Sequence, residues 1–158
     1  MKGLTENDVA VHKMANKYKK HNKYRVAPPG QRKYNGRTYA SKAEMEYAKE
    51  LYMLKKGGEI LEFIEQPRLW LGVPENIYYP DFFIIYRNSS VKDWVPGTNP
   101  KIEDAPSSPF YVDVKGVMTS KFRHTIKLWK NYGTLDLHIV KKKGKRFVTS
   151  EIISPKKG

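Results

Sequence analysis

A chain of 158 residues, 39% of them hydrophobic and 13% aromatic, is long enough for one domain with a buried core and unlike a disordered protein. It contains no cysteine, which excludes disulfides and thiolate metal sites and makes a reducing, cytoplasmic setting the default expectation. No apolar run approaches the roughly 20 residues of a membrane span, and no signal peptide is evident.

The net charge is strongly positive. Thirty Lys and Arg against sixteen Asp and Glu give +14, and residues 1–35 alone hold nine basic and two acidic side chains. Such an excess attracts polyanions, so we expect DNA as the partner; a charged, solubilising surface is the alternative explanation. A membrane is a poorer candidate because the usual amphipathic anchor is missing.

The first 30 residues predict a basic arm ahead of a domain over residues 31–158. Residues 5–20 have cap and apolar spacing for a short helix. Basic side chains interleaved with tyrosines follow, and such an arm can lie along phosphates. The candidate DNA contacts in the arm are Lys17, Lys19, Lys20, Lys23 and Arg25.

Asn35-Gly36 predicts a tight hairpin, and Ser41 opens a helix expected over residues 41–56, which Gly57-Gly58 ends. Three β-rich segments are then expected, at residues 60–66, 68–71 and 78–86. A turn rich in Gly, Pro and Asn predicts that the last two form a hairpin. Residues 87–108, rich in Pro, Ser and Asn, predict a long loop.

Beyond the loop, the sequence predicts a strand, a helix and two further strands. Their expected ranges are residues 110–117, 120–132, 135–140 and 146–153, with a lysine-rich turn at 141–145. This order of elements predicts an α/β or α+β domain whose central mixed sheet is flanked by helices.

Three acidic side chains have placements that require a physical explanation. Asp81 precedes the apolar run 82–85, where a buried acid costs free energy unless a cation pairs with it. Strand alternation after Phe110 places Asp113 and Lys115 on one face and apolar side chains on the other. Helical spacing of 100° per residue places Glu44 on the apolar side of its helix.

A divalent cation would satisfy all three acids, because Mg²⁺ prefers oxygen ligands. Glu44, Asp81 and Asp113 are therefore candidate ligands, with the backbone carbonyl of Val114 completing the shell. Lys115 would orient a water or neutralise charge in the transition state.

Simpler explanations exist for each acid. Ser41-x-x-Glu44 also matches a helix capping box. For Asp113 and Lys115 the alternative is an ordinary surface ion pair, and for Asp81 after Pro80 it is the end of a turn.

The ordered set of Pro80-Asp81 and Asp113-Val114-Lys115, with Glu44 on the preceding helix, resembles the signature of the PD-(D/E)xK nuclease superfamily. It is similar to small phage and prophage members of that superfamily and to the phage junction-resolving endonuclease I family. The similarity extends from about Lys23 to Lys142. Other shared features are Asn35-Gly36, Ser41-Lys42-Ala43-Glu44, Gln66-Pro67-Arg68, Tyr79-Pro80-Asp81-Phe82 and Lys115-Gly116.

The resemblance implies a restriction-endonuclease-like fold, Mg²⁺ or Mn²⁺, and hydrolysis of DNA phosphodiesters. It assigns metal ligation to Glu44, Asp81 and Asp113, and the catalytic amine to Lys115. Two features depart from the family: residues 87–108 form a longer gap than usual, and the arm at residues 1–30 is not part of the shared pattern.

The leading hypothesis is a structure-selective Holliday-junction or branched-DNA resolvase. Symmetric cleavage of a four-way junction needs two active sites, which predicts a homodimer. The alternatives are a site-specific, restriction-like endonuclease and a non-catalytic DNA-binding or scaffold protein.

Further DNA contacts are predicted beside the motif. The helix after Lys115 carries a basic stripe, which would contact phosphates next to the cut or form a solvated helix face. The stripe and its neighbours are Lys121, Arg123, His124, Lys127 and Lys130. Gln66 is expected to bond a water or phosphate near the metal, with a role at a strand edge as the alternative.

Overall fold

The structure is a computed structural model that describes residues 25–86 and 109–157. The predicted helix at residues 5–20 and the predicted loop at 87–108 lie outside these ranges. So do four of the candidate DNA contacts in the arm, namely Lys17, Lys19, Lys20 and Lys23. None of the helices in the described ranges is long and apolar enough to cross a membrane.

The described chain begins with a short 3-10 turn, η1 (Pro29–Arg32), and a two-stranded hairpin, β1 (Lys33–Tyr34) and β2 (Arg37–Thr38). Asn35 and Gly36 both have positive φ, 48° and 76°, as the tightest hairpin turns require. The predicted hairpin is therefore confirmed.

Helix α2 (Lys42–Gly57) is bounded as its sequence predicts. The Ser41 hydroxyl accepts a hydrogen bond from the Glu44 N–H at the N-terminus. At the C-terminus Gly58 takes a left-handed conformation, and its N–H bonds to helix carbonyls. One side of α2 is buried and carries Glu44 together with its apolar residues.

The central sheet has five strands in the order β3-β6-β7-β8-β9. The strands are β3 (Ile60–Glu65), β6 (Phe82–Tyr86), β7 (Phe110–Val114), β8 (Leu137–Lys143) and β9 (Arg146–Ile153). All neighbouring pairs are antiparallel except β7 and β8, which are parallel and are connected through α3 (Ser120–Tyr132). The predicted central mixed sheet flanked by helices is confirmed.

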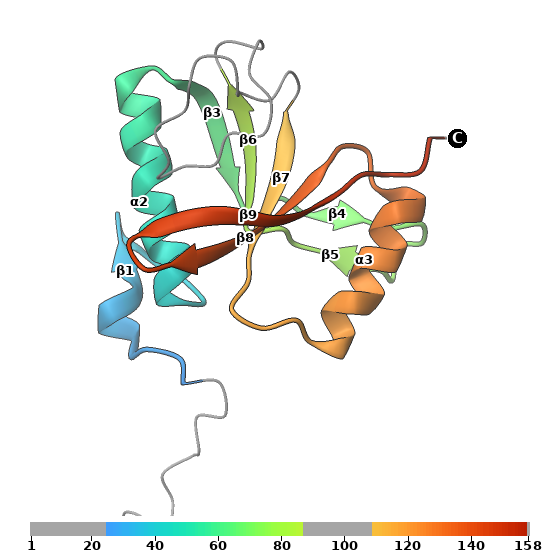
Figure 1. Cartoon of the computed structure of the whole chain (residues 1–158), viewed down its shortest axis with the longest axis horizontal. Helices are drawn as coiled ribbons and strands as arrows, with labels where there is room; N and C mark the ends of the chain where they lie inside the picture. The colour runs from blue at the N-terminus through green and yellow to red at the C-terminus, as the bar shows by residue number, and fades with distance from the viewer. Residues whose placement is uncertain (1–24, 87–108, 158) are drawn as a thin grey trace, which may run out of the picture.

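The two helices cover opposite sides of this sheet (Figure 1). Because strand side chains alternate, β7 contributes Phe110, Val112 and Val114 to the core under α2. Tyr111, on the other face of β7, packs with Trp129 of α3. Strand β7 is thus covered on both faces, and every residue in it is buried.

The prediction of a single strand over residues 78–86 is wrong. The segment forms two strands, β5 (Ile77–Tyr78) and β6, which belong to different sheets. Strand β5 pairs with β4 (Leu69–Trp70) in the predicted hairpin, whereas β6 pairs with β3 and β7. Pro80 lies between them, and its lack of an N–H suits a break in strand pairing.

Two strand ends also differ from the prediction. The strand expected over residues 110–117 ends at Val114. The turn expected at residues 141–145 is shorter, because Lys141, Lys142 and Lys143 all pair with β9. Gly144, with φ 61°, provides the turn, so the lysines extend β8 instead.

Candidate active site

The strand register places Gln66, Asp81 and Asp113 side by side in one row. Glu65 pairs with Phe82, and the next backbone bond runs from the Gln66 N–H to the Asp81 carbonyl at 2.9 Å. On the other side of β6, Phe82 pairs with Val112, so one further step sets Asp81 opposite Asp113. The row Gln66–Asp81–Asp113 runs across the neighbouring ends of β3, β6 and β7. We call this end of the sheet its edge below.

Each aspartate in the row is held by a neighbouring group. Asp81 Oδ2 accepts a hydrogen bond from the Val114 N–H at 2.7 Å, which ties the start of β6 to the end of β7. Asp113 is 1% exposed, and its Oδ2 accepts a hydrogen bond from the Tyr78 hydroxyl. One oxygen of each carboxylate is thus fixed by the protein itself.

Lys115 supplies the positive charge. Its Nζ lies 2.7 Å from Asp113 Oδ1, and it also lies 4.4 Å from the centroid of the Phe122 ring in the first turn of α3. The ammonium is within ion-pair distance of Oδ1 without making a directed hydrogen bond to it. The pair predicted from strand alternation therefore exists, with a buried acid rather than an exposed one.

Glu44 reaches this cluster from helix α2. It is 3% exposed, in agreement with its predicted core-facing position. Its Oε2 accepts a hydrogen bond from the Ala40 N–H at 3.1 Å, and its Oε1 accepts one from the Gln66 side-chain amide at 3.4 Å. Glu44 therefore satisfies the start of its helix and contacts the row across the strands. The contact at the helix start agrees with the capping interpretation, and metal ligation by Glu44 stays a prediction.

Gln66 connects the row to the β1–β2 hairpin. Arg37 donates one hydrogen bond to Gln66 Oε1 at 2.8 Å and another to Glu65 Oε2 at 3.0 Å. Because Arg37 occupies the amide oxygen, the amide NH₂ of Gln66 is left to face Glu44. Gln66 itself has φ 49°, a left-handed conformation that costs a side-chain-bearing residue roughly 1–3 kcal/mol and is often found at functional sites.

Burial and neighbouring negative charges raise the pKa values of Asp81 and Glu44. Burial raises the pKa of the Asp81 carboxyl well above its usual value, and the negative charges of Asp113 and then Glu44 raise it further. The Val114 N–H and the Lys115 ammonium oppose this rise. Burial likewise raises the pKa of Glu44, with the charge of Asp113 contributing and its backbone and Gln66 hydrogen bonds opposing.

The oxygen ligands that these side chains offer suit a hard cation, but their spacing does not form a closed site. Three carboxylates offer the oxygen ligands that Mg²⁺ or Mn²⁺ prefers, and Asp113 Oδ1 is a buried oxygen lacking a directed hydrogen bond. Across residues 25–86 and 109–157, however, no three His, Cys, Asp or Glu side chains stand close enough together to hold an ion. The donor set fits a divalent cation; a closed coordination shell is not formed.

The predicted DNA-contacting side chains of α3 lie on the surface. Phe122 and Trp129 face the core, whereas Lys121, Arg123, His124, Lys127 and Lys130 are exposed. Helix α3 begins next to Lys115, with Thr119 as its N-cap, so this basic surface starts close to the carboxylates. Arg25, the described member of the arm contacts, is exposed as well.

Tyr78 and Arg37 are the contributors that the sequence did not reveal. The Tyr78–Asp113 contact spans 35 positions and the Arg37–Gln66 contact spans 29, so neither produces a local pattern. The one available signal was the predicted hairpin over β4 and β5, which brings Tyr78 close to the row.

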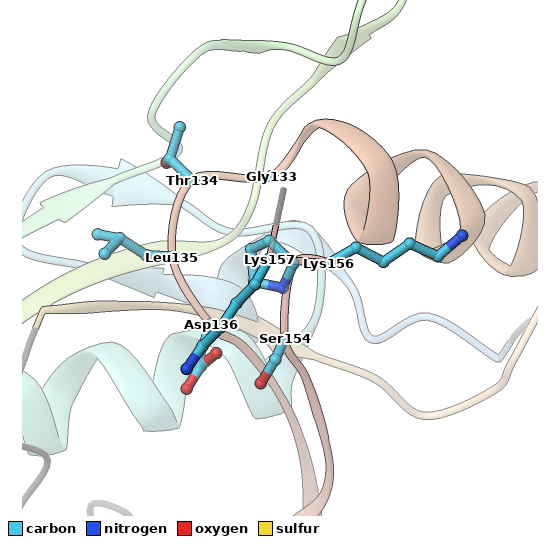
Figure 2. Close-up of a pocket in the computed structure, with 8 residues that line it drawn as sticks. Gly133, Thr134, Leu135, Asp136, Ser154, Lys156 and Lys157 are labelled. Carbon is cyan, nitrogen blue, oxygen red and sulfur yellow. The ribbon is translucent and has the colours of Figure 1, made fainter.

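A pocket of about 500 Å³ lies away from this row, between the α3–β8 connection and the C-terminal segment (Figure 2). Residues 133–136 and 154–157 line it, and Figure 2 shows Asp136 and Ser154 pointing to the same side. None of the four predicted catalytic side chains contributes to its lining. The candidate active site is therefore the row of carboxylates at the strand ends and not this pocket.

Comparison of the chain with family models, with curated proteins and with solved structures gave no match. The functional argument consequently rests on the geometry of the row and the charge around it.

Proposed function

We propose that this protein is a metal-dependent endodeoxyribonuclease that hydrolyses DNA phosphodiesters. The observation that carries the proposal is the convergence of Glu44, Asp81 and Asp113 beside the Lys115 ammonium at one edge of the sheet. Three acids with one ammonium among them leave an excess of negative charge, and the acids that lack a counter-charge repel one another. A phosphodiesterase needs this imbalance to bind a cation.

Glu44, Asp81 and Asp113 would hold the ion, with the Val114 backbone carbonyl as a further ligand. Mg²⁺ or Mn²⁺ would supply a water of lowered pKa and a positive charge against the scissile phosphate. Lys115 places a second positive charge beside Asp113, where it would stabilise the additional negative charge of the phosphorane. Gln66 keeps the Glu44 carboxylate directed to the same edge.

The proposal extends to a restriction-endonuclease-like core and to branched DNA as the substrate. The core is supported by the mixed sheet, with acids at the adjacent ends of β6 and β7 and an acid on the helix before the sheet. Shape-selective binding is supported by a net charge of +14 and an exposed basic helix surface, since phosphate contacts carry no sequence information. Symmetric cutting of a junction further requires a homodimer.

The deciding experiment is a cleavage assay on four-way junction, flap and linear duplex DNA, with Mg²⁺, with Mn²⁺ and with EDTA. Asp81→Asn is the test variant, because an amide oxygen can still accept the Val114 hydrogen bond while the charge is lost. Glu151→Gln is the matched control, since it neutralises an exposed carboxylate on the edge strand β9.

We expect the wild type and Glu151→Gln to cut when Mg²⁺ is present, and Asp81→Asn to bind DNA without cutting it. If Asp81→Asn cuts as well as the wild type, the assigned site is wrong. Equal cutting of junction and plain duplex would reject the branched substrate and retain the nuclease. DNA binding without cutting under any condition would instead establish a non-catalytic binding protein.

A further inference from the structure

The outer face of the β4–β5 hairpin exposes large apolar side chains. Trp70 pairs with Ile77 across the hairpin, and the two are 56% and 38% exposed. Tyr79, one strand alternation beyond Ile77, is 51% exposed. An exposed tryptophan beside further apolar side chains is costly to keep in water, so this face is a candidate contact surface.

A cation lies against the most exposed of these rings. The Arg68 guanidinium carbon is 5.1 Å from the centroid of the Trp70 ring. Within the described residues Arg68 forms no ion pair, and the one acid in the segment from Leu69 to Tyr79 is Glu75 in its turn. The surface therefore presents an aromatic plane together with a positive charge that remains available to an anion.

The inner face of the same hairpin belongs to the candidate active site. Leu69 and Tyr78 pair with each other and pack against the core under α3, where the Tyr78 ring contacts Trp129. The Tyr78 hydroxyl donates to Asp113. Two residues after Tyr79, the chain reaches Asp81. A ligand on the outer face is thus separated from the row of carboxylates by one two-stranded layer.

We propose that the Trp70 face binds unpaired nucleotides of the DNA substrate, with a base stacked on Trp70 and the adjoining phosphate paired with Arg68. Single-stranded DNA alternates flat apolar bases with anionic phosphates, which matches a ring and a guanidinium side by side. In a fully paired duplex the bases are already stacked on one another and cannot stack on the Trp70 ring. The inference rests on the proposed nuclease function. Within the class of branched DNA it specifies a substrate with a single-stranded segment beside the cut, such as a flap, over a fully paired four-way junction.

Charge favours a nucleic acid over a protein as the occupant. The protein carries a net charge of +14, and the exposed residues of the neighbouring helix α3 are predominantly basic. A second copy of the same chain would bring the same positive field and an Arg68 of its own, so self-association through this face is disfavoured electrostatically. A polyanion gains from both charges and from the ring.

The test measures the affinity of the full-length protein for three labelled DNAs of equal length in EDTA, at a fixed salt concentration. The DNAs are a flap with a single-stranded arm, a four-way junction and a blunt duplex. The variants are Trp70→Ala, Trp70→Phe and Arg68→Ala. Leu61→Ala is the control, because Leu61 is 52% exposed on β3. Thermal melting establishes that each variant is folded.

We expect Trp70→Ala to weaken flap binding roughly 5- to 150-fold, the range corresponding to a stacking free energy of about 1–3 kcal/mol per base. Trp70→Phe should retain most of the affinity, Arg68→Ala should lose part of it, and duplex binding should change little. Unchanged flap binding by Trp70→Ala overturns the inference. So does an equal loss on duplex, or a change in oligomeric state with DNA affinity intact.

The cleavage assay separates this inference from the nuclease proposal. If Asp81→Asn abolishes cutting but Trp70→Ala leaves flap affinity unchanged, the nuclease stands and the stacking surface is rejected. If the wild type never cuts but Trp70→Ala weakens flap binding, the nuclease is rejected and the surface remains as a site for unpaired DNA.

Discussion

Replacing Tyr78 with Phe isolates one hydrogen bond at the centre of the candidate site. The change deletes an oxygen that donates to Asp113, a carboxylate 1% exposed, and leaves the ring contacts with Phe122 and Trp129 intact. A hydrogen bond to a charged group contributes about 1.5–3 kcal/mol, and the substitution leaves the buried Asp113 oxygen without the Tyr78 donor. For a chain of 158 residues this corresponds to a decrease in melting temperature of roughly 3–12 °C.

Urea denaturation of the wild type and Tyr78→Phe measures the loss directly. Tyr79→Phe is the matched control, because that half-exposed ring should change the free energy of unfolding by less than about 0.5 kcal/mol. If Asp113 is a metal ligand, Tyr78→Phe should also require roughly 10- to 100-fold more Mg²⁺ for cleavage. Equal stability of Tyr78→Phe and the wild type would show that the hydroxyl is not what satisfies Asp113. A stability loss with an unchanged Mg²⁺ requirement would remove Asp113 from the metal site.

Three further outcomes test the remaining parts of the structure. Because burial chiefly raises the pKa of Asp81 in the folded state, the free energy of unfolding of the metal-free protein should fall as the pH rises from about 4 through that raised pKa. Over the same pH range, Asp81→Asn should lose less stability than the wild type, and added Mg²⁺ should reduce the loss. Thermal melting as a function of pH measures all three. Arg37→Ala frees the Gln66 amide to rotate away from Glu44, so cleavage should slow and require more Mg²⁺ while the melting temperature changes by only a few degrees. Gly72→Ala combines a φ of 87° with a Cβ that would lie 2.7 Å from a tyrosine ring of α3, and calorimetry should show a destabilisation of about 1–3 kcal/mol.

The features that sequence predicted well are those with local causes. Strand alternation placed Asp113 and Lys115 on one face, and the two side chains form an ion pair. Helical spacing placed Glu44 toward the core, where it is buried. Asn35-Gly36 predicted a turn because only a few residue types tolerate positive φ at both positions. In each case, the information lies within a few residues of the feature.

The features that sequence missed depend on which distant segments pair. A continuous strand from residue 78 to residue 86 satisfies local preference, but β5 pairs with β4 while β6 pairs with β3 and β7. Lys141, Lys142 and Lys143 looked like a turn because of their charge; their pairing with β9 fixes them in a strand. Tyr78 reaches Asp113 only after β5 has paired with β4 and β6 has paired with β7, so no local pattern identifies this contact.

For the proposed nuclease, the charge balance of the candidate site predicts the order in which the cation and the DNA bind. Among the described residues, Lys115 is the cation that forms an ion pair with any of the three carboxylates, so the cluster remains negative when all three are ionised. A DNA phosphate approaching that edge alone would be repelled, whatever the +14 of the whole chain contributes at long range. A bound divalent cation reverses the local sign. The surface charge can therefore bring DNA to the protein without metal, whereas the scissile phosphate should enter the row only after the carboxylates have bound the cation. DNA binding should accordingly survive EDTA, and protection of the Asp81 edge from proteolysis or hydrogen exchange by DNA should require Mg²⁺.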